Sequence, residues 1–139
     1  WYTKASAQGH SGAMFNLGLC YENGWGCDQN QTKAVEWYTK ASAEGHSDAM
    51  YNLGCCYAAG DGCDQDYTTA FKWYTKASAQ GHSAAMFCLG NCYDNGYPCD
   101  QNDEKAFEWY EKSAQLGDKH AQDALLDYTT ASDSDDDLL

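Results

Sequence analysis

Residues 45–80 read GHSDAMYNLGCCYAAGDGCDQDYTTAFKWYTKASAQ, and this stretch decides the fold because the chain carries it in three versions. The version before it, at 9–44, reads GHSGAMFNLGLCYENGWGCDQNQTKAVEWYTKASAE. The version after it, at 81–116, reads GHSAAMFCLGNCYDNGYPCDQNDEKAFEWYEKSAQL. Four tryptophans mark the same 36-residue period: Trp1, Trp37, Trp73 and Trp109. Such a period is typical of stacked helical units and not of a single globular core.

Each copy predicts two helices joined by a short turn. A serine oxygen can accept from the first free backbone amides of a helix, so we expect Ser11, Ser47 and Ser83 to cap the first helices. Glycine tolerates the left-handed conformation that ends a helix, and the predicted ends are Gly24, Gly60 and Gly96. The predicted caps of the second helices are Asn30, Asp66 and Asn102, and Gly45 closes the second helix of copy one.

The predicted inward faces follow helical spacing. In copy one they are Ala13, Leu17, Cys20 and Tyr21 on the first helix, and Ala34, Trp37, Tyr38 and Ala41 on the second. Gly18, Gly54 and Gly90 lie within first helices, where a glycine costs ~1 kcal/mol relative to alanine. A glycine kept in all copies at that cost predicts close approach of the two helices, with a large Trp or Tyr side chain opposite.

The chain therefore predicts an all-α solenoid of antiparallel helix pairs with 36-residue repeats at about 10–45, 46–81 and 82–117. Residues 1–9 match the end of a repeat, so we expect a partial N-terminal helix and a longer chain or larger assembly around it. DKHAQDALLDY at 118–128 loses the repeat pattern and predicts a capping helix over 118–130. The acidic residues 131–139 predict a disordered tail.

The repeated motif A-x-x-x-LG-x-CY-x-x-G-x-G-C-x-Q-[ND]-x-x-x-A-x-x-WY-x-K-[AS] resembles the Sel-one-like repeat, a relative of the tetratricopeptide repeat, over residues 1 to 126. The resemblance implies a right-handed superhelix of helix pairs, with the first helix of each pair on the concave side. It also implies a scaffold or adaptor role in a protein complex. Two features depart from the family pattern. Cys27, Cys63 and Cys99 stand where valine is usual, and Tyr97-Pro98 replaces a turn that keeps glycine in the other copies.

Six of the eight cysteines form three identically spaced pairs: Cys20/Cys27, Cys56/Cys63 and Cys92/Cys99. The first of each pair ends a helix and the second follows the turn, which could bring them within the 5–6 Å Cα separation that a disulfide needs. One interpretation is a local disulfide in every repeat, in an oxidising compartment. The other is a buried thiol that acts as a small apolar side chain.

Composition narrows the class of partner. The chain carries a formal charge of −13, with eight lysines and no arginine. An acidic surface disfavours nucleic acid and anionic membranes, and no apolar run approaches the ~20 residues that span a bilayer. A protein partner with a basic or apolar segment is the more natural expectation. In the alternative interpretation the negative charge only keeps the protein soluble and does not select a partner. Composition does not choose between a cytoplasmic and a lumenal or secreted location.

No motif points to a catalytic or cofactor site. Recurring Asp28, Asp64 and Asp100 stand one repeat apart, whereas acid–base catalysis needs groups within reach of one substrate. The histidine ladder His10, His46 and His82 has the same spacing, about 10 Å if helices pack at their usual separation, and cannot share one metal ion. We expect these histidines to lie beside helix caps. The sequence thus predicts no enzyme, no cofactor and no metal.

Binding is argued from the positions that vary between copies. The variable positions of the first helix and turn are 15/51/87, 16/52/88, 19/55/91, 22/58/94 and 25/61/97. Aromatic residues dominate interface hot spots. The predicted partner-binding residues are Phe15, Leu19, Trp25, Tyr51, Phe87, Asn91 and Tyr97. The competing interpretation packs Phe15, Tyr51 and Phe87 between repeats, because these positions are never polar.

The sequence therefore predicts a non-enzymatic scaffold that binds partner proteins through its concave face. The alternative is a secreted or lumenal, disulfide-bridged repeat protein acting at a host or envelope surface. Counting free thiols separates the two.

Overall fold

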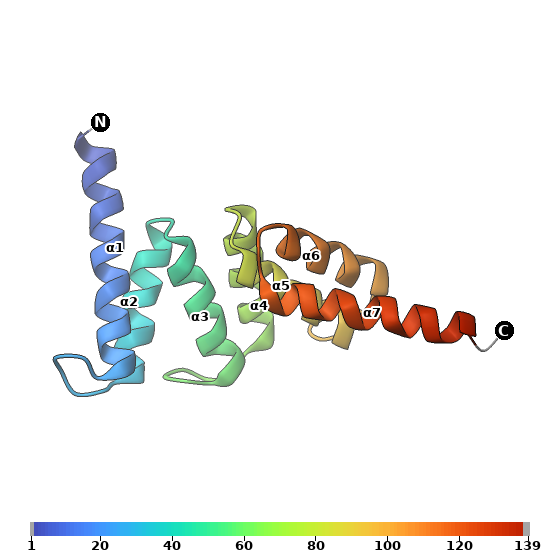
Figure 1. Cartoon of the computed structure of the whole chain (residues 1–139). Coiled ribbons are helices and arrows are strands. Elements are labelled where there is room, and N and C mark those ends of the chain that lie inside the picture. Colours follow the sequence, from blue (N-terminus) through green and yellow to red (C-terminus); the bar gives the residue numbers. More distant parts are fainter. Residues whose placement is uncertain (1, 138–139) are drawn as a thin grey trace. The chain divides into compact units, whose positions relative to one another are not determined.

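A computed structural model describes the backbone of residues 2–137 and the side chains of residues 9–128. The described backbone contains seven α-helices and no strand (Figure 1). The helices are α1 (Tyr2–Asn23), α2 (Gln31–Ala43), α3 (Ser47–Ala59), α4 (Tyr67–Ala79), α5 (Ser83–Asn95), α6 (Asp103–Gln115) and α7 (Lys119–Asp137). Equivalent helices recur at intervals of 36 residues, which confirms the predicted all-α repeat fold.

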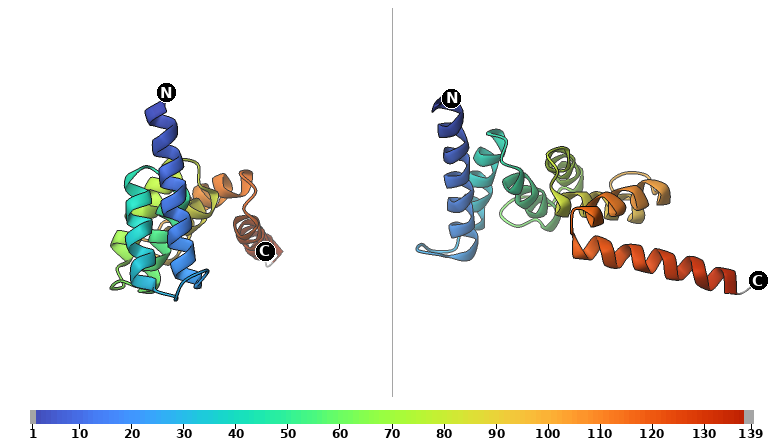
Figure 2. Two further views of the ribbon diagram at one scale, coloured as in Figure 1. Left: turned by 90° about the vertical axis from the view of Figure 1, so that its left-hand side faces the viewer. Right: turned by 45° about the horizontal axis from the view of Figure 1, so that its top comes forward.

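The helices pack in chain order within two compact units, Trp1–Gln80 and Gly81–Leu139. In the first unit α1 packs against α2, α2 against α3, and α3 against α4. In the second unit α5 packs against α6 and α6 against α7. Figure 2 shows α1 and α2 side by side as an antiparallel pair. Within each unit, consecutive helices thus bury their apolar stripes against one another, as a solenoid requires.

The second helices begin and end as the sequence predicts. Asn30, Asp66 and Asn102 adopt extended backbone angles, and each side chain accepts from the amide three residues on, at 3.0–3.1 Å. Beyond the other ends, Gly45, Gly81 and Gly117 take φ values of +88°, +87° and +96°. These polar caps and left-handed glycines set the boundaries of α2, α4 and α6.

The predicted serine caps of the first helices are wrong, because histidine takes that position. The Nδ1 atoms of His46 and His82 accept from the amides of Ala49 and Ala85, each at 3.2 Å. Ser47 and Ser83 are instead the first helical residues. A histidine with an extended backbone and a free Nδ1 lone pair does what an Asn or Asp oxygen does at other caps.

The glycines within the first helices make room for tyrosine rings. A Cβ added at Gly18, Gly54 or Gly90 would lie 2.5, 2.7 or 2.5 Å from the Cε1 atom of Tyr38, Tyr74 or Tyr110. The close approach predicted from the sequence is therefore confirmed for the tyrosines. Tyr38 and Tyr110 are fully buried by it, whereas Trp37, Trp73 and Trp109 are half-buried and each carries a lysine amine over its ring.

Copy one departs from prediction at its start. The chain is one uninterrupted helix through Gly9 to Ser11, so Ser11 lies inside α1 and does not begin a helix. The predicted inward residues Ala13 and Leu17 are exposed in copy one, whereas their equivalents in copy two, Ala49 and Leu53, are fully buried. The physical reason is coverage: within the described residues α1 packs extensively against α2 alone, while α3 lies between α2 and α4.

The last helix, α7, is longer than predicted. Asp118 Oδ1 accepts from the Ala121 amide at 2.9 Å and caps it. The helical backbone continues to Asp137, past residue 130 where we expected the capping helix to end and into the segment 131–139 expected to be disordered. Leu138 and Leu139 lie outside the described residues.

Candidate partner-binding surface

The turns that carry the variable residues share their closing hydrogen bonds, although copy three has a cis Tyr97-Pro98 peptide where the other copies have Gly26 and Gly62 at φ of +74°. The glycines that end α1, α3 and α5 have φ of +74°, +75° and +72°. A glutamine side chain then reaches back to a carbonyl of the last helical turn: Gln29 to Glu22, Gln65 to Ala58 and Gln101 to Asp94, at 2.8–3.1 Å. The amide of the next cap residue closes the loop on the carbonyl of Tyr21, Tyr57 or Tyr93. Hydrogen bonds therefore order the backbone of the turn, and the residue type at each turn position decides which side chain it presents.

We call residues 25, 61 and 97 the variable turn position. Their amides donate to the carbonyls of Cys20, Cys56 and Cys92 at 2.9–3.1 Å, so the three copies hold this position alike. Trp25 is 61% exposed and Tyr97 is 60% exposed. Asp61 is also exposed. Two large aromatic side chains are thus held out toward solvent at equivalent points of a rigid repeat.

The first-helix aromatics contact the repeat instead. The ring of Phe15 stacks on His46 at 4.7 Å between centroids and lies 5.9 Å from Tyr38. Phe87 has the equivalent contacts, 5.7 Å to Tyr110 and 5.7 Å to His120. Tyr51 lies 6.0 Å from Tyr74. All three are half-buried. Phe15 and Phe87 contact the start of the next helix pair, whereas Tyr51 contacts its own pair. A partner contact through their remaining exposed part stays a prediction.

Leu19 and Asn91 occupy one variable position with different roles. Leu19 is half-buried and packs against a core cluster made of Ala34, Val35, Tyr38, Leu53 and Cys56. Asn91 Oδ1 accepts from the Tyr110 hydroxyl at 2.7 Å. Both side chains are thus occupied inside the repeat, and the aromatics of the variable turn position lie further out.

The tyrosine hydroxyls explain part of the variation that the sequence assigned to binding. Tyr38 donates to Glu22 Oε2 at 2.6 Å, Tyr74 to the Sγ of Cys55 at 3.6 Å, and Tyr110 to Asn91 and Asp94. Burial is the main cause that raises the pKa of Tyr38 and of Tyr110 above the usual range, and the Glu22 and Asp94 carboxylates add to it. Positions 22 and 94 therefore satisfy a buried hydroxyl. In the sequence, the only sign of this hydrogen bond is that an acidic residue stands at position 22 or 94 while the tyrosine is kept in every copy.

The helical repeats match a known family over most of the chain. The family model described as Sel1 repeat matches residues 1–10, 11–46, 47–82 and 83–118. The chain belongs to the Sel1 repeat family. Proteins with Sel1 repeats generally act as protein-interaction scaffolds and are typically not enzymes.

Solved structures with Sel1 repeats superpose well on this chain. A Sel1 repeat protein from Oxalobacter formigenes is 34% identical, with a TM-score of 0.77 over 80% of this chain and 46% of that chain. The protective antigen c5321, present in uropathogenic Escherichia coli and displaying an SLR fold, is 35% identical, with a TM-score of 0.81 over 90% and 27%. Cysteine rich protein B of Helicobacter pylori shares the fold at 21% identity, with a TM-score of 0.69 over 88% and 94%.

This chain spans less than half the length of the first two of these structures. No curated protein sequence matches it significantly.

Each Sel1 repeat brings its two cysteines close together. The Cys27 thiol lies 3.6 Å from the Cys20 carbonyl oxygen, across the turn. Burial raises the pKa of Cys56 to about 12 and that of Cys92 to about 11, and the neighbouring Cys63 and Cys99 thiols add to these shifts. No disulfide joins any of the eight cysteines, all of which lie within the described residues 9–128. Because the thiolate is the reactive form, Cys56 and Cys92 are poor nucleophiles at neutral pH. The disulfides stay a prediction.

Within the described residues, no group of three His, Cys, Asp or Glu side chains is arranged to hold a metal ion. The histidines of the ladder serve the helix starts at 46 and 82, as described above. The described helices include none that is both long and apolar enough to cross a membrane.

Proposed function

We propose that this Sel1 repeat chain is a non-enzymatic scaffold that binds partner proteins through the concave face formed by its first helices and the turns that follow them. The exposure of Trp25 carries the proposal. Tyr38, Leu53 and Ala34, whose residue types are common to all copies, are fully buried. Trp25 is the one tryptophan outside the 36-residue series, and its side chain is 61% exposed on a turn that hydrogen bonds hold in place.

An exposed aromatic side chain on an ordered turn is suited to binding a partner protein. Burying a tryptophan side chain in an interface yields a large apolar contribution, and little conformational entropy is lost because the turn is already ordered. Tyr97 offers a second aromatic at the equivalent place. The chain's charge of −13 favours a partner segment that is basic or has basic residues around an apolar anchor.

Partner capture by turn variants tests the proposal. Trp25→Asp and Tyr97→Asp install the residue that copy two has at the variable turn position, Asp61. The change is compatible with the turn at Trp25, because Gly26 and Gly62 follow residues 25 and 61 with the same φ of +74°. The matched control is Thr39→Glu, which adds a charge at an exposed second-helix position where copy three has Glu111. We expect quantitative pull-down to show capture lost in the turn variants and kept in the control. Equal capture by all three proteins contradicts the proposed surface.

A second candidate is a secreted or lumenal protein whose repeats are closed by disulfides between Cys20 and Cys27, Cys56 and Cys63, and Cys92 and Cys99. In copies two and three the Cys63 and Cys99 thiols lie near enough to Cys56 and Cys92 to add to the raised pKa of those thiols, which favours it. Alkylation of the denatured, unreduced protein followed by intact mass decides the matter. Two modified thiols, Cys55 and Cys88, support the bridged form, and eight modified thiols contradict it.

A further inference from the structure

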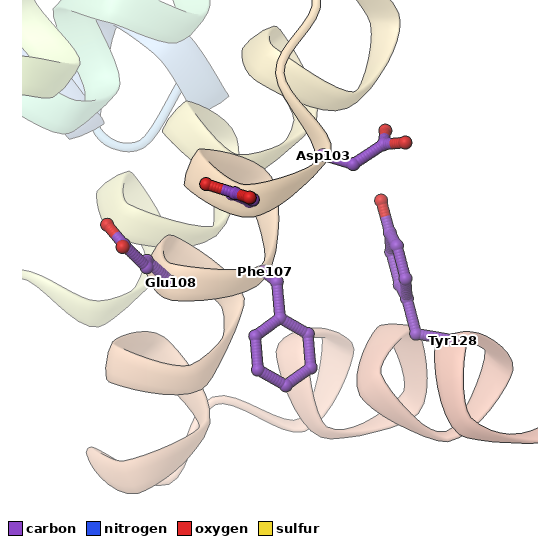
Figure 3. Close-up of a pocket in the computed structure, with 5 residues that line it drawn as sticks. Asp103, Phe107, Glu108 and Tyr128 are labelled. Atoms are coloured by element: carbon purple, nitrogen blue, oxygen red, sulfur yellow. The ribbon is translucent and has the colours of Figure 1, made fainter. Parts of the chain in front are cut away.

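A pocket lies between α6 and α7 in the C-terminal unit. It has a volume of about 440 Å³ and is lined by Asp103, Glu104, Phe107, Glu108 and Tyr128. In Figure 3 Asp103 and Phe107 of α6 face Tyr128 of α7, while Glu108 points away from Tyr128 at the rim. The pocket therefore combines aromatic rings with three carboxylates.

Phe107 and Tyr128 form the aromatic wall of the pocket, and a hydrogen bond and a ring contact hold it in place. The Tyr128 hydroxyl donates to Asp94 Oδ1 at 2.7 Å, and the Tyr110 hydroxyl lies 3.2 Å from Asp94 Oδ2. The Phe107 and Tyr128 rings meet edge to face, with centroids 6.3 Å apart and planes at 71°. The wall is thus ordered before anything binds, which lowers the entropic cost of binding.

The equivalent place between α2 and α3 is closed. Val35, the counterpart of Phe107, is only 8% exposed and belongs to the core cluster with Cys56, the counterpart of Tyr128. The turn after α3 lies over the start of α2, because a Cβ on Gly62 would come within 2.3 Å of the Gln31 carbonyl oxygen. α7 continues as a helix where α3 turns, and Phe107 is left 40% exposed.

The cluster of three acids at this place is peculiar to copy three. Copy one has Gln31, Thr32, Val35 and Glu36 there, and copy two has Tyr67, Thr68, Phe71 and Lys72. Copy three has acids at three of the four positions. Within residues 9–128, no salt bridge neutralises Asp103, Glu104 or Glu108. The lysines of α6 are directed elsewhere, Lys105 over the Tyr93 ring at 5.4 Å and Lys112 over the Trp109 ring at 4.8 Å.

We propose that this pocket receives an arginine side chain from a basic segment of a partner protein. A guanidinium group stacks on aromatic faces through its plane and donates hydrogen bonds to carboxylates through its edge. Phe107 and Tyr128 provide the first kind of contact, and Asp103 and Glu104 provide the second. The proposal deepens the scaffold function proposed above and rests on it.

Charge complementarity selects this occupant over others. An apolar segment or a second copy of this acidic chain would cover the three carboxylates without a counter-charge, and desolvating unpaired charges is costly. A cationic side chain compensates them as it enters. The net charge of −13 also draws basic segments toward this surface.

The test is an NMR titration of the full chain with a capped heptapeptide that carries one central arginine among glycines and serines. We expect saturable shifts of the ring signals of Phe107 and Tyr128, weakened by added salt. The same peptide with citrulline, which keeps the shape of arginine without its charge, should leave these signals unchanged. Shifts of equal size with citrulline would overturn the proposal.

Two identical substitutions on α6 provide the matched comparison. Glu104→Thr and Glu111→Thr each install a residue that copies one and two have, but only Glu104 lines the pocket. We expect Glu104→Thr to weaken the arginine peptide about fivefold and Glu111→Thr to leave its affinity unchanged. Phe107→Val, the copy-one residue, should weaken it about tenfold. Equal losses in the two threonine variants would show only diffuse attraction to an acidic surface and would contradict the pocket.

Other outcomes separate the occupants and the two proposals. Concentration-dependent dimerisation that Phe107→Val abolishes would mean that a second copy fills the pocket, and the proposal would be wrong. If Trp25→Asp keeps partner capture while the arginine peptide still binds, the proposed turn surface fails and the pocket stands. If the arginine peptide does not bind while Trp25→Asp loses partner capture, the pocket proposal fails and the turn surface stands.

Discussion

The eleven residues WYTKASAQGHS occur twice, at 1–11 and at 73–83, and they adopt two backbone conformations. In the second occurrence α4 ends at Ala79, Gly81 takes φ of +87° and His82 caps α5. In the first, the described backbone from Tyr2 onward stays helical through the same letters. The local sequence is identical, so it does not decide whether the chain reverses.

The difference lies in what the flanking helices can pack against. Ending α4 before Gly81 gives up helical hydrogen bonds, and the loss is offset because α4 packs on α3 and α5 packs on α6. Figure 1 shows the N-terminal part of α1 extending beyond the end of α2. Among the described helices this part of α1 extends past α2, whereas α4 and α5 each pack on a neighbouring helix along their length. We infer that the repeat turn depends on tertiary contact on both sides.

The largest contrast is expected between glycines of an internal helix and of α1. Gly54→Ala should destabilise the protein by about 1–3 kcal/mol, because its Cβ would lie 2.7 Å from the Tyr74 ring. Gly12→Ala meets nothing within 4 Å and should stabilise by up to about 1 kcal/mol. Urea unfolding followed by circular dichroism measures both. Similar values for the two variants would mean that the tyrosine ring moves aside freely.

Alanine in place of the single glycine of each identical segment, Gly9 or Gly81, tests the conformational difference itself. Gly81→Ala places alanine at φ +87° and should cost about 1–2 kcal/mol. Gly9→Ala lies inside α1 and should stabilise by about 1 kcal/mol, since alanine is the better helix former. The same urea experiment decides. A destabilising Gly9→Ala would show that residues 9–11 form a turn in solution.

The histidines of the same segments should differ as well. His82→Ala removes the side chain that accepts from the Ala85 amide and should cost about 1 kcal/mol. His10→Ala removes an exposed side chain within a helix and should change stability by less than about 0.5 kcal/mol. His82→Asn keeps a capping acceptor and serves as the control. Loss of stability in His82→Asn equal to that in His82→Ala would argue against a capping role.

The smallest expected effect is a pH dependence at the C-terminal end. Burial, helped by the Asp94 carboxylate, raises the pKa of Tyr128 to about 12, above the value near 10 of an unfolded tyrosine. The unfolded chain therefore loses this proton first, and stability falls as pH rises from 10 toward 12. Thermal unfolding of the wild type and of Tyr128→Phe across this range measures it. The slope should be shallower in Tyr128→Phe, and identical slopes would contradict the shift.

The sequence was sufficient to predict the structural features that recur in every copy of the repeat. The second-helix caps at Asn30 and Asp66 and the close approach at Gly54 follow from residue type and spacing, and the structure confirms them. It misled at the first-helix caps, because serine is the commoner cap and stands directly beside histidine.

The candidate site was harder to predict than the fold. The partners of the tyrosine hydroxyls join residues 16 to 19 apart on packed helices, so spacing on one helix does not reveal them. The exposure of Trp25 was suggested only by its replacement with Asp61 one repeat later. The pocket beside Tyr128 follows from α7 running on as a helix, which depends on packing and not on a motif.

The central claim is that the repeated residues maintain the fold and the variable turn position provides recognition. It is tested most directly by measuring thermal unfolding and partner capture on one variant, Trp25→Asp. Because the side chain is 61% exposed, we predict a Tm within about 2 °C of the wild type together with loss of the captured partner. A Trp25→Asp protein that keeps both its Tm and its partner would contradict the account.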